Sequence, residues 1–206
     1  MQDFSLARRV MVENQLRPEG VTDRAVLAAM GSIAREDFVP AEARAFAYFD
    51  RPLKIGAGRA MMPPAALGRL LSALAPRAGE RALVVGAGTG YSAALLRSIG
   101  LDVVALESDQ ALAAAGTEIT VGDLDKGWAK GAPYDLLLLD GAVEQIPAEL
   151  IRQLREGGRL GGAIIDRGIA RLVVGRVAGG SLGLRSLADA DVEPLPGFER
   201  PRAFTF

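Results

Sequence analysis

VVGAGTGYSAALL (Val84–Leu96) carries the strongest fold signal in this 206-residue chain. Gly86, Gly88 and Gly90 follow an apolar run and lead into a segment with helical spacing. Glycines suit such a turn because the backbone must reverse sharply and approach a ligand closely, with the amides of the helix N-terminus facing it. The stretch therefore predicts a strand, a ligand-binding loop and a helix. A tight strand-to-helix turn without a ligand is the alternative.

Short apolar runs alternate with helical segments from this loop onward. The alternation is typical of a mostly parallel sheet whose strands are buried on both faces. Near the C-terminus the pattern changes, and VAGGS (Val177–Ser181) has the composition of a turn between antiparallel strands. We therefore predict an α/β fold that ends in an antiparallel hairpin. The first four strands are expected at residues 82–86, 102–107, 118–122 and 135–140.

The N-terminal third of the chain has a helical period, with apolar side chains three and four residues apart. Asp23 and Thr22 are candidate N-caps of one helix. Further helices are expected at residues 40–48 and 64–74, the second with leucines on one face.

The length of the chain fits one domain with a substantial core. We predict a single domain over residues 1–206. It consists of a helical N-terminal cover (1–76) and a cofactor-binding α/β core (77–206).

The composition excludes several kinds of chemistry. The chain contains no cysteine and no histidine, which excludes disulfides, Cys or His zinc sites and imidazole-dependent triads, and we expect no metal. The 24 Lys and Arg nearly balance the 25 Asp and Glu, so neither nucleic acid nor an acidic membrane is an expected partner. Charged residues interrupt the first apolar segment, so we expect no signal peptide or membrane anchor and a cytoplasmic protein.

Two acids extend the pattern of the Gly-rich loop. Glu107 ends the next predicted strand, where a carboxylate accepts hydrogen bonds from both hydroxyls of an adenosine ribose. The third glycine of the loop falls one residue too early for the dinucleotide pattern G-x-G-x-x-G, because Tyr91 stands at the sixth position. The spacing G-x-G-x-G favours S-adenosylmethionine instead. Asp123 is then placed to bind the adenine amino group.

At this point the chain resembles the protein-L-isoaspartate O-methyltransferase family, as a divergent member. The resemblance rests on the Gly-rich loop and on further segments in the same order. It implies a Rossmann-like class I methyltransferase that repairs aged proteins by methylating the carboxyl group of L-isoaspartyl residues with S-adenosylmethionine. Its partner would be an isoaspartyl protein or peptide. The loop glycines would line the methionine part, Glu107 the ribose and Asp123 the adenine. The segments are MVENQLRPEGVTDRAVLAAMGSIAREDFVP, AYFDRPLKIGAGRAMMPP, VGDLDKGW, APYDLLLLDGAVEQIP and QLREGGRL.

The substrate loop departs from the family pattern Q-T-[IV]-S, because Arg59, Ala60, Met61 and Met62 occupy it. Both hydroxyl positions are lost, to Ala60 and Met62, and methionine cannot donate the hydrogen bonds that orient a carboxylate. Arg59 is a candidate anchor for an acidic substrate, since a guanidinium binds a carboxylate through two parallel hydrogen bonds. The alternative is a solvated loop arginine. The methionines are either core residues or an apolar wall of the site.

The chain also differs from the family outside the substrate loop, and one acid has two possible roles. Val84 replaces an acid that the family carries before the Gly-rich loop, and only 15 residues separate Glu107 from Asp123. Asp140 ends a predicted strand, where it either caps a helix or structures a loop, or else binds substrate. The first hypothesis is therefore isoaspartyl repair. The alternatives are a family member that binds S-adenosylmethionine without repair activity, and a methyltransferase retargeted to an apolar small molecule.

Overall fold

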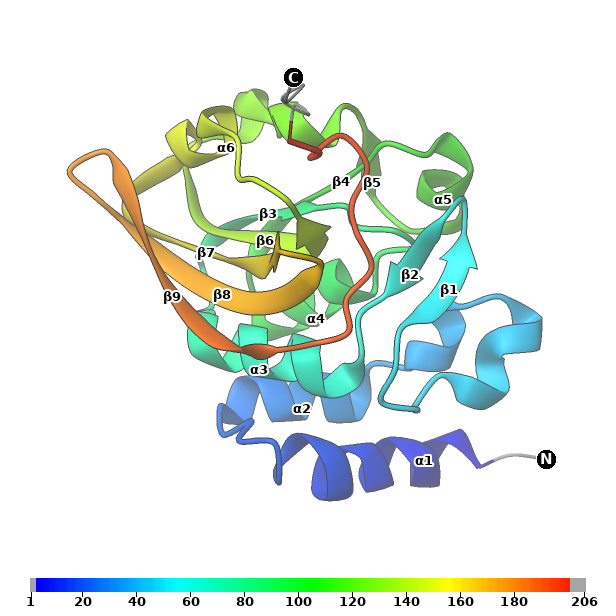
Figure 1. Cartoon of the computed structure of the whole chain (residues 1–206). Helices are drawn as coiled ribbons and strands as arrows, with labels where there is room; N and C mark the ends of the chain where they lie inside the picture. Colours follow the sequence, from blue (N-terminus) through cyan, green and yellow to red (C-terminus); the bar gives the residue numbers. More distant parts are fainter. Residues whose placement is uncertain (1–2, 201–206) are drawn as a thin grey trace.

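The computed structural model describes residues 3–200, whose centre is a seven-stranded sheet with the order β5-β4-β3-β6-β7-β8-β9 (Figure 1). Strands β3 to β7 are parallel, and β8 and β9 are antiparallel to their neighbours. This arrangement confirms the predicted α/β class and the C-terminal hairpin. The strands are β3 (Arg81–Val85), β4 (Asp102–Glu107), β5 (Ile119–Val121), β6 (Tyr134–Val143), β7 (Leu154–Asp166), β8 (Ile169–Ala178) and β9 (Ser181–Asp189).

Burial of the strands follows their place in the sheet. In the central strand β3, Ala82 and Val84 face one hydrophobic core, and Leu83 and Val85 face the other. The edge strand β5 contradicts the prediction of burial on both faces, since Val121 is 48% exposed. An edge strand has a neighbour on one side only, and here it is also short, so it is not covered like the centre.

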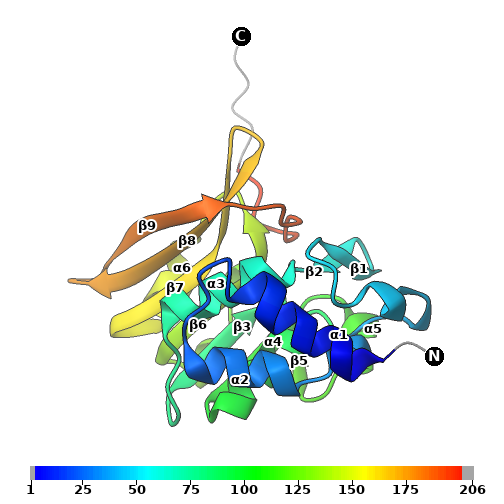
Figure 2. The same cartoon turned by 90° about the horizontal axis from the view of Figure 1, so that it is seen from below.

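Helices cover both faces of the sheet. Helices α3 and α4 pack against the strands on one face, and α1 and α2 form a further layer outside them (Figure 2). Helix α6 packs against β7 and the short helix η4. The α-helices are α1 (Phe4–Met11), α2 (Arg24–Ser32), α3 (Pro64–Leu74), α4 (Tyr91–Ile99), α5 (Gln110–Ala115) and α6 (Ala148–Arg152). The short helices are η1 (Val12–Leu16), η2 (Arg35–Phe38), η3 (Ala41–Phe46), η4 (Leu124–Lys126) and η5 (Ala129–Gly131).

The N-terminal cover is less uniformly helical than predicted. Asp23 caps α2 as expected, accepting hydrogen bonds from two backbone amides of its first turn. The helix predicted at residues 40–48 is the short 3-10 helix η3. The segment after it forms an antiparallel hairpin of β1 (Leu53–Gly56) and β2 (Arg59–Met61). This hairpin brings the predicted substrate loop into a strand.

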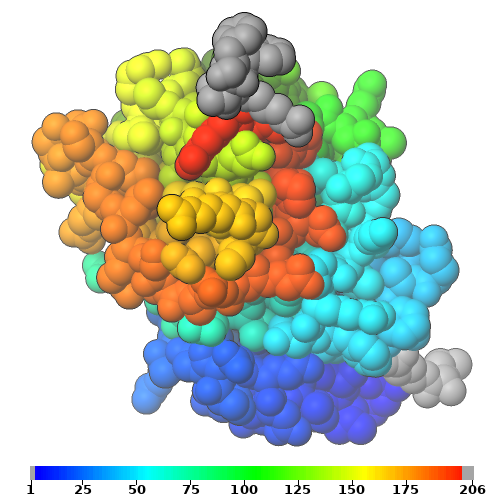
Figure 3. Space-filling view, viewed as in Figure 1, coloured from blue at the N-terminus to red at the C-terminus, as the bar shows by residue number. Residues whose placement is uncertain are grey.

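A C-terminal segment, residues 190–198, returns across the sheet to the same place. It is held to β6 by hydrogen bonds from the Ala142 amide to the Glu193 carbonyl (2.9 Å) and from the Leu195 amide to the Ala142 carbonyl (2.7 Å). Its orange-to-red surface lies beside the cyan surface of the β1–β2 hairpin (Figure 3). Two segments far apart in sequence therefore cover the Gly-rich loop together.

Candidate active site

The Gly-rich loop lies where the order of the strands reverses. From β3 the chain proceeds to β4 and β5 on one side and then returns to β6 on the other. In open parallel sheets, ligands bind at the carboxyl ends of the strands at such a point. Gly86, Gly88 and Gly90 all have positive φ angles, of 79°, 56° and 98°. This left-handed backbone explains why the sequence uses glycine at each of them.

Glu107 lies at the end of β4, beside this loop, and its side chain is fully buried. One carboxylate oxygen accepts a hydrogen bond from the Gly88 amide at 2.7 Å. The other accepts hydrogen bonds from the amides of Ser108 and Asp109, at 2.8 and 3.2 Å. Backbone donors therefore orient the carboxylate toward the loop.

Arg59 extends from β2 into the same place. Its Nη1 lies 2.9 and 3.1 Å from the two oxygens of Glu107, and its Nη2 donates to the Gly86 carbonyl at 2.8 Å. The side chain is only 5% exposed. The interpretation of Arg59 as a solvated loop arginine is therefore wrong, because the guanidinium is paired inside the protein.

The space over the glycines is filled by side chains of the chain itself. A Cβ atom placed on Gly86 would lie 2.6 Å from Leu195 and 2.8 Å from Arg59, and one on Gly88 would lie 2.6 Å from Ile55. The cavity that remains measures about 10 Å³, which is about the space of one water. The backbone and Glu107 fit an adenosine-containing cofactor, but a cavity of this size cannot hold one while Arg59 and its neighbours keep these positions.

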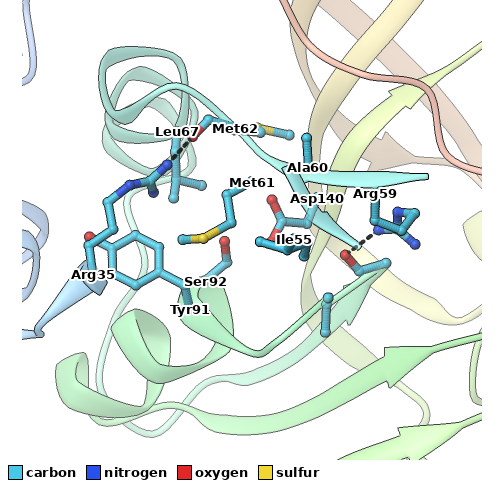
Figure 4. A pocket seen from close by; sticks show the side chains of 13 residues that line it. Arg35, Ile55, Arg59, Ala60, Met61, Met62, Leu67, Tyr91, Ser92 and Asp140 are labelled. Atoms are coloured by element: carbon cyan, nitrogen blue, oxygen red, sulfur yellow. Dashed lines mark hydrogen bonds between the residues drawn. The ribbon is translucent and has the colours of Figure 1, made fainter. Parts of the chain in front are cut away.

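Asp140 is the buried acid of this cavity (Figure 4). Burial raises its pKa to about 6, against the opposing effects of a hydrogen bond from Ser92 and of the charges of Arg59 and Arg35. The residue lies inside β6, which continues to Val143. It does not end a strand or cap a helix, so the helix-capping alternative is wrong.

The substrate-loop positions line the same cavity. Met61 and Met62 are 7% and 2% exposed and belong to the core on the α3 side, and with Ala60 they also line the cavity. Both interpretations of the methionines are therefore correct, because Met61 and Met62 are core residues that also form an apolar wall of the cavity. The residues that line the cavity are Arg35, Ile55, Arg59, Ala60, Met61, Met62, Leu67, Gly86, Ala87, Gly88, Tyr91, Ser92 and Asp140.

Arg35 is a residue of this cavity that the sequence did not indicate. It is completely buried, and it donates from Nε to the Ala47 carbonyl at 2.7 Å and from Nη2 to the Met62 carbonyl at 2.6 Å. Its guanidinium lies 4.9 Å from the centre of the Tyr91 ring. Burial lowers its pKa. An arginine in a short polar segment, REDF, carries no sequence signal of burial. Only its place in MVENQLRPEGVTDRAVLAAMGSIAREDFVP, a segment that resembles the family, could have indicated it.

Asp123 lies apart from the cavity. It follows β5, whose end is held beside Glu107 by a hydrogen bond from the Gly122 amide to the Glu107 carbonyl at 3.0 Å. Its side chain is exposed and does not cap η4. The structure thus places Asp123 on the same edge of the sheet as the Gly-rich loop, outside the residues that line the cavity.

A mostly parallel sheet with a glycine loop at its switch point, an acid at the end of the next strand and a C-terminal antiparallel hairpin defines a Rossmann-like methyltransferase of the class that uses S-adenosylmethionine. Residues 7–166 match the model of the family Protein-L-isoaspartate(D-aspartate) O-methyltransferase (PCMT). The chain belongs to this family, as the resemblance predicted.

Curated relatives carry the same family name. The chain is 46% identical over 164 residues to a protein-L-isoaspartate O-methyltransferase from Methylorubrum populi, with 75% of this chain and 77% of that protein covered. It is 37% identical over 209 residues to protein-L-isoaspartate O-methyltransferase 1 from Rhodopseudomonas palustris, with 95% and 85% covered.

Solved structures share the fold. One protein-L-isoaspartate O-methyltransferase superposes with a TM-score of 0.81 at 21% identity, covering 92% of this chain and 66% of its own. A putative family member from Plasmodium falciparum, in complex with S-adenosyl-L-homocysteine, gives a TM-score of 0.75 at 20% identity and covers 91% and 97%. At this identity the likeness supports the fold.

Proposed function

We propose that this protein transfers the methyl group of S-adenosylmethionine to the side-branch carboxylate of L-isoaspartyl residues in damaged proteins. The observation that carries the proposal is the placement of the buried Glu107 carboxylate against the Gly88 amide, in a chain of the PCMT family. The partner would be an isoaspartyl protein or peptide. We also propose the cytoplasm as its compartment, as expected from the sequence. Within residues 3–200, no helix is long and apolar enough to cross a membrane.

Some residues of the chain would bind the cofactor, and others would position the acceptor carboxylate. Gly86, Gly88 and Gly90 would hold the methionine part, Glu107 the ribose hydroxyls and Asp123 the adenine. When bound, S-adenosylmethionine supplies an electrophilic methyl group on a sulfonium. An ionised carboxylate needs no general base to accept it, so the task of the protein is to position the carboxylate in a site without water.

Positioning is where this chain differs from the family pattern. Ala60 and Met62 have no hydroxyl to donate to the acceptor, although both line the cavity. A buried carboxylate without those donors is destabilised by about 1–3 kcal/mol, which corresponds to a rate loss of about 5-fold to 150-fold. We therefore expect activity that is weaker than that of a member with the complete loop.

The test is transfer of labelled methyl from S-adenosylmethionine to a synthetic isoaspartyl peptide, beside its normal aspartyl twin. Base-labile label on the isoaspartyl peptide alone supports the proposal. No label, from folded protein that binds S-adenosylhomocysteine in a calorimeter, refutes it.

A family member without repair activity is the second candidate. The pairing of Arg59 with Glu107 favours it, because the pair occupies the carboxylate that the ribose would need. Failure of the wild type to bind S-adenosylhomocysteine would select a stronger form of this candidate, a member that has lost cofactor binding as well. Retargeting to an apolar small molecule, the third candidate, is favoured by the apolar wall of Met61 and Met62. It predicts cofactor binding without transfer to either peptide.

A further inference from the structure

We propose that Arg59 exchanges one anionic partner for another: it pairs with Glu107 while the cofactor is absent, and it binds the carboxylate of the methyl acceptor once the cofactor is present. Arg59 would then be both a competitor of the cofactor and the specificity-determining residue for an acidic acceptor. The second half of this inference rests on the proposed function.

The first support is that Arg59 and a ribose would need the same acceptor atoms. Nη1 of Arg59 contacts both oxygens of Glu107, at 2.9 and 3.1 Å. The two ribose hydroxyls would bind these same oxygens. The guanidinium also lies 2.8 Å from the position of a Cβ on Gly86, directly against the loop. Cofactor and guanidinium therefore exclude each other.

The second support is that Glu107 keeps most of its hydrogen bonds when the ion pair with Arg59 breaks, whereas Arg59 does not. Without Arg59, Glu107 keeps its hydrogen bonds from the amides of Gly88, Ser108 and Asp109. Arg59 would keep only the Gly86 carbonyl. A guanidinium that stays buried after losing its paired carboxylate is strongly unfavourable, so a displaced Arg59 turns toward solvent, where it is free to bind a new anion.

The third support is the place to which Arg59 can turn. The residue lines the inner cavity and also an outer groove of about 370 Å³ between the β1–β2 hairpin and the C-terminal segment. The other charged residues that line this groove are Lys54 and Glu193, whose charges balance. A guanidinium turned into the groove gives it net positive charge, which favours a carboxylate.

The fourth support is the chemistry of the substrate loop. Among residues 59–62, Arg59 alone has a side-chain hydrogen-bond donor. The family pattern has hydroxyls where this chain has Ala60 and Met62. A guanidinium that arrives only after the cofactor is bound would replace the lost donors and would order the two binding events.

The first experiment compares binding of S-adenosylhomocysteine, measured by calorimetry without any acceptor, to the wild type and to Arg59→Gln. Glutamine is the residue of the family pattern at this position. We expect at least tenfold tighter binding by Arg59→Gln, because its Glu107 is free. The matched control is Arg159→Gln, since Arg159 also joins a largely buried glutamate, Glu80, and a backbone carbonyl, far from the site in sequence. It should bind like the wild type. Unchanged or weaker binding by folded Arg59→Gln overturns the competition.

The second experiment measures binding of the isoaspartyl peptide with and without saturating S-adenosylhomocysteine. In the wild type the cofactor product should tighten peptide binding at least tenfold, and Arg59→Gln should lose this coupling. Equal coupling in both proteins overturns the acceptor half of the inference. If the peptide binds to neither protein in either state, the proposed function fails, while the competition for Glu107 is still judged by the first experiment.

A third measurement needs no variant, which matters if Arg59→Gln does not fold. The guanidinium NMR signals of Arg59 in the wild type should show a buried, slowly exchanging group that shifts and becomes exchangeable when S-adenosylhomocysteine is added. Signals that stay unchanged at saturation overturn the exchange of partners.

Discussion

Arg35 and Arg59 approach the same cavity from opposite sides but are held by different kinds of partner (Figure 4). Arg35 donates to two backbone carbonyls, those of Ala47 and Met62. Arg59 binds a carboxylate, Glu107, which also has donors of its own. A backbone carbonyl cannot leave without unfolding a segment, whereas a carboxylate can exchange one donor for another. We therefore assign Arg35 to the architecture of the site and Arg59 to its chemistry.

The largest expected effect is on stability, from Arg35→Met. The variant leaves two buried carbonyls without donors, and each loss of a charged hydrogen bond costs about 1.5–3 kcal/mol. The free energy of unfolding, measured in urea, should therefore fall by about 3–6 kcal/mol. Arg59→Gln should lose less, because Glu107 keeps three amide donors. Equal losses of unfolding free energy in the two variants would contradict the assignment of a structural role to Arg35 alone.

Asp140 lies between the two arginines, and the charges of both act on its carboxyl group (Figure 4). Its pKa is raised from 3.8 to about 6, so the stabilisation from its neutral form is complete below about pH 4 and is lost as the pH rises to about 6. Asp140→Asn does not titrate. Its stability relative to the wild type should therefore increase by about 2 kcal/mol between pH 4 and pH 7.

The control for this pH dependence is Asp135→Asn. Burial alone would raise the pKa of Asp135, but the Arg81 amide and the Arg155 guanidinium outweigh it and lower the pKa. The wild type then gains stability from Asp135 as the pH rises, so this variant should change in the opposite direction to Asp140→Asn. Urea denaturation at several pH values measures both stability differences. A difference between Asp140→Asn and the wild type that does not change with pH would contradict the raised pKa of Asp140.

Met62 connects the two arginine sites, because Arg35 holds its carbonyl while its side chain lines the cavity. Met62→Ser restores a hydroxyl of the family pattern, and kcat/KM for an isoaspartyl peptide should rise about tenfold, the value of one hydrogen bond of about 1.4 kcal/mol. Met61→Ser is the matched control, since it removes a buried methionine next to it without restoring a family hydroxyl. A similar change in kcat/KM in both variants would show that the missing hydroxyl at position 62 does not limit activity.

The smallest expected effect concerns the loop beneath Arg59. Gly88 and Gly179 have nearly equal positive φ angles, 56° and 58°, so alanine should cost about 1–2 kcal/mol of backbone strain at either. A Cβ on Gly88 would also lie 2.6 Å from Ile55, whereas one on Gly179 meets no atom within 4 Å. Gly88→Ala should therefore lose about 1 kcal/mol more in thermal unfolding. Equal losses would show that the β1–β2 hairpin is free to move off the loop.

The positions of the central strands and of the loop along the chain could be predicted because their signals are local. The apolar run before Gly86 and the predicted strand at 102–107 are strands β3 and β4, the latter with the predicted bounds. The spacing of the glycines reflects positive φ angles that only glycine adopts readily. The edge strand β5 and the β1–β2 hairpin were harder, because their exposure and pairing depend on neighbours distant in the chain.

The fold class and the glycine loop with Glu107 follow from residue type and spacing along the chain. The loss of the substrate-loop hydroxyls follows from comparing Ala60 and Met62 with the pattern of the family that the chain resembles. The partners of the two arginines became visible in the folded structure. Arg35 and Arg59 are both polar residues in short segments, and no local pattern distinguishes a buried arginine from a solvated one. Their roles depend on partners 27 to 48 residues away, Met62 and Glu107, because ion pairs and buried hydrogen bonds form between elements that only folding brings together.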